Sequence, residues 1–187
     1  MSTNLEIEAK SMLDESSYLK LIKGKESERY VQINYYIDTS NFDVHKSGLG
    51  LRIRLKDGTY ELTVKIRQNE GKLEVNQIID ESEYLAFKES NIFPTGEVKE
   101  ALIKQNIDIE KLHVFTELKC TRLDLHYKTS LLSIDKSEFN GITDYEIESE
   151  DSSMEIAKAN LIDFLNKNEV PYNENFVSKL RRARDSL

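Results

Sequence analysis

The chain has 187 residues, a single cysteine and a formal net charge of −8 at pH 7. A chain of this length buries roughly 70% of its unfolded surface, so we expect one domain over residues 1–187. One cysteine excludes an internal disulfide, and the acidic balance argues against a general nucleic-acid binder. Because no segment approaches the roughly 20 apolar residues of a membrane span, we expect a soluble cytoplasmic protein without membrane or nucleic-acid partners.

Residues 5–10 alternate charged and uncharged side chains, which is the period of a β-strand. Glu6, Glu8 and Lys10 would therefore lie on one face of the strand. The side chains expected on the other, apolar face are Leu5, Ile7 and Ala9. Alone, this pattern is also typical of an antiparallel sheet with one solvated face. The pattern favours a functional face over a solvated one only if other strands repeat it with the opposite charge.

Residues 14–26 are predicted to form a helix capped by Asp14, and the aromatic and β-branched residues 29–38 a strand. Gly48 and Gly50 lack the surroundings of a P-loop or a dinucleotide fingerprint. We therefore interpret both glycines as turn residues.

The alternation returns with positive charge in residues 51–56, where Arg52 and Arg54 share a face. The Asp57-Gly58 pair that follows is typical of a tight hairpin turn. It leads into residues 59–67, which alternate again. We expect two paired basic strands.

The remaining elements follow from the same periodicities. Predicted strands cover residues 73–79, 113–126, 131–135 and 144–150, with turns at 69–71 and 140–141. Predicted helices cover residues 81–89, 97–105, 152–168 and 176–184.

Four features of these elements concern their tertiary surroundings. The strand 144–150 carries carboxylates at alternate positions, which repel one another unless a counter-charge lies nearby. Arg122 shares the strand parity of apolar Leu118 and Cys120, so we expect a β-bulge to direct it. The basic residues of the last helix are interpreted mostly as a solvated face. The helix 152–168, capped by Ser152 or Ser153, should bury Ile156, Ala159, Ile162, Leu165 and, weakly, Leu161.

The sign of the charge is segregated by strand, whereas ordinary solvated faces mix the two signs. Rolling about eight such strands into a closed or nearly closed barrel would set acidic and basic faces against each other. The predicted fold is therefore α+β, an eight-stranded antiparallel β tunnel with a charged, water-filled lumen and helices outside. Carboxylates select a hard cation such as Mg²⁺, Mn²⁺ or Ca²⁺ over zinc, and Arg suits phosphate. Together they indicate a metal-bound polyphosphate.

An ordered series of motifs resembles the CYTH domain, also called the triphosphate tunnel metalloenzymes. The resemblance runs from residue 6 to about residue 180. Its motifs are Glu6-x-Glu8-x-Lys10, Tyr35-Tyr36-x-Asp38-Thr39, Leu51-Arg52-Ile53-Arg54, Leu62-Thr63-Val64-Lys65, Thr121-Arg122, Asp135, Glu146-x-Glu148 and Ser178-Lys179.

This resemblance implies a metal-dependent triphosphatase that uses Mg²⁺ or Mn²⁺ on inorganic tripolyphosphate or an organic triphosphate such as thiamine triphosphate. The implied metal ligands are Glu6, Glu8, Asp135, Glu146 and Glu148, and Glu150 ranks below them. The implied phosphate ligands are Lys10, Arg52, Arg54, Lys65, Arg122 and Lys179. Glu6, Glu8, Lys10 and Lys65 form the implied catalytic group.

Three alternatives stay open. A class IV-type adenylate cyclase would use the same grip but direct a ribose hydroxyl onto the α-phosphate. A non-catalytic polyphosphate- or nucleotide-binding module would bind without turnover, and an α+β protein with merely charged strands would do neither. His45, His113, His126 and Cys120 lack partner spacings that suggest chemistry, so structural roles are expected for them.

Overall fold

The computed structural model describes residues 2–69 and 71–187, and this part of the chain divides into two compact units. Unit 1 comprises the N-terminus up to Leu5 and Gln32–Leu118, and unit 2 comprises Glu6–Val31 and Lys119–Leu187. Strands β1 (Ser2–Glu6), β3 (Tyr30–Asp38) and β7 (His113–Tyr127) contribute residues to both units. The turn predicted at residues 69–71 includes Glu70, which lies outside the described residues.

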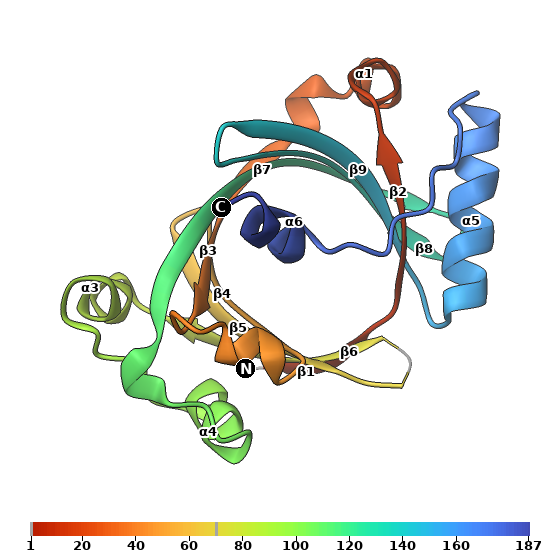
Figure 1. Cartoon of the computed structure of the whole chain (residues 1–187). Coiled ribbons are helices and arrows are strands. Elements are labelled where there is room, and N and C mark those ends of the chain that lie inside the picture. The colour runs from red at the N-terminus through yellow and green to blue at the C-terminus, as the bar shows by residue number, and fades with distance from the viewer. Residues whose placement is uncertain (1, 70) are drawn as a thin grey trace. The chain divides into compact units, whose positions relative to one another are not determined.

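Unit 1 is built on antiparallel strands in the hydrogen-bonded order β1-β6-β5-β4-β3. Helices α3 and α4 lie on one side of these strands (Figure 1). The elements are β1 (Ser2–Glu6), α2 (Asp43–Lys46), β4 (Leu49–Lys56), β5 (Thr59–Arg67), β6 (Lys72–Ile79), α3 (Glu81–Ser90), α4 (Glu97–Lys104) and the 3-10 turn η2 (Ile109–Lys111).

The predicted hairpin between β4 and β5 is confirmed. Asp57 and Gly58 have φ angles of 49° and 76°, which is the left-handed pair of a type I′ turn. The register pairs Lys56 with Thr59 on either side of the turn. Gly50 lies within β4, so the prediction that it is a turn residue is wrong.

The alternation in β4 and β5 separates an apolar face from a polar one. Leu51, Ile53, Leu62 and Val64 are fully buried in the core of unit 1, together with side chains of α3 and α4. Because strand side chains alternate, the residues between them lie on the other face. The core therefore fixes the direction of the basic row.

Unit 2 is built on the order β7-β8-β9-β2. Figure 1 shows α5 on one face of these strands and α6 on the other. The elements are β2 (Glu8–Leu13), α1 (Glu15–Ile22), the 3-10 turn η1 (Glu26–Glu28), β8 (Ser130–Phe139), β9 (Ile142–Glu150), α5 (Met154–Lys167) and α6 (Lys179–Asp185).

Helices α1 and α5 close the core of unit 2 against the apolar side of its sheet. Ile134 and Ile147 pack there with Leu161 and Leu165 of α5, all fully buried. Ser153 caps α5, as predicted, by accepting a hydrogen bond from the backbone N–H of Ile156.

The predicted apolar stripe of α5 is partly wrong. Ile156 is 41% exposed and Ala159 is also exposed, whereas Ala157 is buried. Asn160 is turned inward instead, where its amide donates to the Thr129 and Ser130 hydroxyls at 3.2 and 2.9 Å. The buried face of α5 therefore holds the polar side chain of Asn160 beside Leu161 and Leu165.

The predicted first strand is divided, so the described residues form nine strands rather than eight. β1 pairs with β6 in unit 1, and β2 pairs with β9 in unit 2. Ile7 lies between β1 and β2 and is buried. Leu5 was expected on the apolar face but is 52% exposed. It lies in β1, whereas the buried residues of the predicted apolar face begin at Ile7 and continue with Ala9 in β2.

Other boundaries shift by a few residues. Asp14 caps α1 as predicted, but the helix ends at Ile22. The predicted last helix begins only at Lys179, where the Ser178 side chain accepts from the Arg181 N–H. The short strand expected at residues 131–135 is the longer β8.

Candidate metal and phosphate site

The backbone register of unit 2 places its charged residues in rows across one face of the sheet. Residues directly opposite on neighbouring strands point to the same side. Reading from β7 through β8 and β9 to β2, three successive rows are Arg122-Asp135-Glu146-Met12, Asp124-Ser133-Glu148-Lys10 and His126-Leu131-Glu150-Glu8. Residues that lie far apart in the sequence thus meet on one face.

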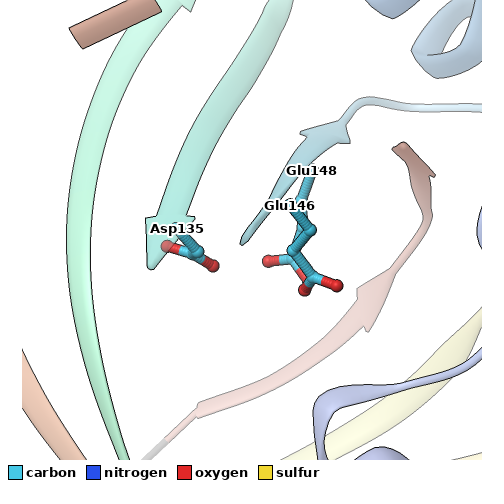
Figure 2. Close-up of side chains that lie close together, drawn as sticks. All are labelled: Asp135, Glu146 and Glu148. Carbon is cyan, nitrogen blue, oxygen red and sulfur yellow. The ribbon is translucent and has the colours of Figure 1, made fainter. Parts of the chain in front are cut away.

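Three carboxylates form the centre of this face. Figure 2 shows Asp135 of β8 and Glu146 and Glu148 of β9 directed toward the same region. One oxygen from each lies within 4.8 Å of the others. Asp135 and Glu146 are fully buried, and the Glu148 side chain is 12% exposed. Buried carboxylates this close require positive partners.

Arg122 supplies one of these partners. Its Nε and Nη2 donate to both oxygens of Asp135 at 2.7 and 2.6 Å, a bidentate pair. Nη2 also donates to Glu148 Oε2 at 2.7 Å. The pairing of β7 with β8 runs without interruption from Lys119–Glu138 to Tyr127–Ser130. The expected β-bulge is therefore wrong, because Arg122 and Cys120 lie on the same charged face.

Two lysines complete the pairing. Lys10 Nζ contacts Glu148 and lies 2.9 Å from Glu8, which joins Glu8 to the central carboxylates. Lys179 Nζ reaches from α6 to Asp135 at 2.8 Å, to Glu148 at 2.9 Å and to Glu146. Its ammonium thus touches all three members of the acidic group.

Arg182 and Asn175 belong to this site but were not predicted from the sequence. Arg182 Nε donates to Asp144 at 2.7 Å, and its Nη2 lies 2.7 Å from Glu146. The Asn175 amide donates to the same Glu146 oxygen at 3.2 Å. The solvated interpretation of the last helix is wrong for Arg182 and Arg184, whose side chains are 15% and 12% exposed. For Arg182, the spacing of three residues from Lys179 was the available signal, because such residues share a helix face.

The electrostatics of the cluster follow from burial and pairing. Burial alone would lower the pKa of Lys10 and Lys179, but the surrounding carboxylates raise both above the ordinary lysine range. Burial would raise the pKa of Asp135, yet Arg122 and Lys179 hold it below its ordinary value. Burial dominates at Glu146 and raises its pKa. Pairing therefore favours the charged forms of Lys10, Lys179 and Asp135.

The predicted acidic residues Glu6 and Glu150 lie at strand ends. Glu6 is half-buried at the end of β1, and Glu150 is exposed at the end of β9, opposite Glu8. The group of three close carboxylates includes neither.

The basic residues of β4 and β5 lie on the polar face of unit 1. Arg54 Nε donates to Asn34 Oδ1 at 3.0 Å, and Lys65 Nζ lies 2.5 Å from the buried Glu74. Arg52 Nε is buried without a hydrogen-bond partner among the described residues. Glu74, opposite Lys65 on β6, was missed because a single acid within the predicted meander gave no local signal. Lys65 and Arg52 lower its pKa against the effect of burial.

The family model for the CYTH domain matches residues 4–183 of this chain. The chain belongs to the CYTH domain family. YjbK of Bacillus subtilis, provisionally named a triphosphatase, is 34% identical to this CYTH domain over 153 residues, which are 80% of this chain and 79% of YjbK.

Solved structures share the CYTH fold. A Bacillus halodurans protein provisionally named an adenylate cyclase has a TM-score of 0.90 and 32% identity, covering 97% of this chain and 98% of its own. HpAC1 from Hippeastrum has a TM-score of 0.79 at 22% identity, covering 97% and 96%, and supports the fold alone. These matches confirm the predicted α+β antiparallel fold class. None of the described helices of this CYTH domain is long and apolar enough to span a membrane.

The donor set of the acidic group fits a hard divalent cation. It offers only carboxylate oxygens, and Mg²⁺, Mn²⁺ and Ca²⁺ prefer oxygen ligands. Asp135, Glu146 and Glu148 come from two adjacent strands whose register is fixed over nine residue pairs. The CYTH domain therefore holds a carboxylate set suited to a metal ion.

Proposed function

We propose that this CYTH domain hydrolyses a triphosphate with the help of Mg²⁺ or Mn²⁺, and that water is the attacking group. The observation that carries this proposal is the buried face of unit 2, where carboxylates and cations are interleaved. A pure anion-binding protein has little use for carboxylates at the centre of its site. A metal-bound polyphosphate needs both, because carboxylates bind the metal and cations bind the phosphates.

Asp135, Glu146 and Glu148 would hold the metal. Glu8 is linked to them because the Lys10 ammonium pairs with both Glu8 and Glu148. Glu6 is assigned to the same role from its motif position. The metal, when bound, would neutralise phosphate oxygens and polarise the phosphorus centre. The geometry supports this assignment because the three carboxylates are prepositioned by strands rather than loops.

The cations would bind the phosphate oxygens and stabilise the charge that develops on the leaving group. In unit 2 these are Lys10, Arg122 and Lys179. The planar fork of Arg122 suits phosphate and is paired with Asp135 in this structure. In unit 1 we assign the same role to Arg52, Arg54 and Lys65. The buried Nε of Arg52, which has no hydrogen-bond partner among the described residues, favours an anionic ligand there.

An adenylate cyclase activity is the second candidate, favoured by the provisional name of the Bacillus halodurans relative. It would use the same metal and phosphate ligands but direct a ribose hydroxyl at the α-phosphate. Hydrolysis is preferred because YjbK is provisionally named a triphosphatase.

A substrate panel separates the two candidates. Purified protein is incubated with tripolyphosphate, thiamine triphosphate and ATP, each with Mg²⁺, with Mn²⁺ or with a chelator. Metal-dependent release of orthophosphate supports hydrolysis. A cyclase would release diphosphate from ATP together with cyclic AMP, so cyclic AMP as the main product would overturn the proposal. Glu148→Gln should be inactive. Glu155→Gln, on an exposed part of α5, is the matched control.

A further inference from the structure

The ammonium of Lys179 lies where the three carboxylates converge. It contacts Asp135 at 2.8 Å, Glu148 at 2.9 Å and also Glu146. Arg122 pairs with two of these acids and Arg182 with one. Lys179 therefore occupies the position that a cation shared by all three carboxylates would take.

Every oxygen of the three carboxylates already contacts a donor. Arg122 accounts for Asp135 Oδ1 and Glu148 Oε2, and Arg182 and Asn175 account for Glu146 Oε2. The other three oxygens contact Lys179, and Lys10 shares one of them. A metal ion that binds through all three acids must therefore displace the Lys179 ammonium.

The helix that carries Lys179 is held independently of this side chain. Arg182 is paired with Asp144, and the Asn140 amide donates to the Ala183 carbonyl oxygen at 2.9 Å and to Ser186 Oγ at 3.0 Å. The segment before the helix bonds to β2 through its backbone, from Asn175 N–H to the Lys10 oxygen at 3.1 Å. A flexible four-carbon stem can therefore move its ammonium while α6 stays in place.

We propose that Lys179 is a built-in counter-cation, exchanged for the metal when a polyphosphate arrives. This inference rests on the proposed function. A polyphosphate offers the displaced ammonium a new anionic partner, and the divalent ion takes its place among the carboxylates. Metal and polyphosphate therefore bind cooperatively, and the free protein binds metal weakly.

The test measures Mn²⁺ binding by isothermal titration calorimetry, without activity as the readout. The proteins are wild type, Lys179→Met, Lys179→Gln and the control Arg181→Met, which removes the same charge from an exposed position of α6. Each is titrated alone and with a non-hydrolysable imido analogue of tripolyphosphate. Circular dichroism verifies that each variant is folded.

We expect both Lys179 variants to bind Mn²⁺ at least about tenfold more tightly than wild type, a factor typical of coupling between two ligands. The control should match wild type. The analogue should raise the Mn²⁺ affinity of wild type by a similar factor, and that of the Lys179 variants by less.

Equal Mn²⁺ affinity in wild type and the Lys179 variants would overturn the exchange but leave the metal site intact. If the analogue leaves the Mn²⁺ affinity of wild type unchanged, this result alone would overturn the exchange. Failure of all four proteins to bind Mn²⁺, even with the analogue, would overturn the proposed metal-dependent function as well.

Discussion

Replacing Asp135 by Asn tests whether the buried charges of unit 2 depend on each other. Asp135 is fully buried and pairs with Arg122 at 2.6 and 2.7 Å and with Lys179 at 2.8 Å. The amide keeps the shape of the side chain but leaves two buried cations with less compensation. Removing one member of a buried ion pair costs about 3–5 kcal/mol, so we expect a loss of this size in the free energy of unfolding.

The assay is urea unfolding at pH 7, followed by circular dichroism. Glu138→Gln is the matched control, because Glu138 lies on the same strand and its pair with Lys119 is 3.8 Å long and partly exposed. Such surface pairs contribute about 0–1 kcal/mol, so the control should barely change stability. A loss for Asp135→Asn below about 1 kcal/mol would refute the reasoning.

The same pair of proteins gives a pH prediction. The pKa of Asp135 is lowered from its ordinary value of 3.8, since Arg122 and Lys179 outweigh the effect of burial. A depressed pKa contributes stability that is fully present above the ordinary value and is lost as the pH falls through the folded one. The stability difference between wild type and Asp135→Asn should therefore be largest at neutral pH and narrow below about pH 4. A difference that widens on acidification would contradict this assignment.

Three further predictions concern other residues. Glu8→Ala should lower metal-dependent triphosphate turnover at least about 100-fold while the far-ultraviolet circular dichroism spectrum stays unchanged, and retention of most activity would remove Glu8 from the site. Arg54→Ala should weaken binding of tripolyphosphate by about tenfold or more, measured by calorimetry, because it removes a charge-assisted phosphate contact. Gly58→Ala should cost about 1 kcal/mol in urea unfolding, since its φ of 76° strains a residue with a side chain although nothing lies within 4 Å of the added carbon. An unchanged midpoint would contradict the left-handed turn.

The local sequence was sufficient to predict the direction of side chains within a strand. Alternation predicted that Arg52 and Arg54 lie on one face of their strand and the core residues Leu51 and Ile53 on the other, and the structure confirms this. Turn and cap chemistry was equally local. Asp57-Gly58 closes a hairpin and Ser153 caps a helix, because both depend on a few neighbouring backbone groups.

Which charges neutralise one another was decided only by the tertiary structure. Lys10 reaches Glu148 because β2 pairs with β9, and Lys179 and Arg182 reach Glu146 from a helix at the end of the chain. Local periodicity gives the face on which a side chain lies but not the segment that approaches this face. The sequence therefore determined the rows of charge, and long-range strand pairing and helix docking determined the ion pairs, because these pairs join groups separated by many residues.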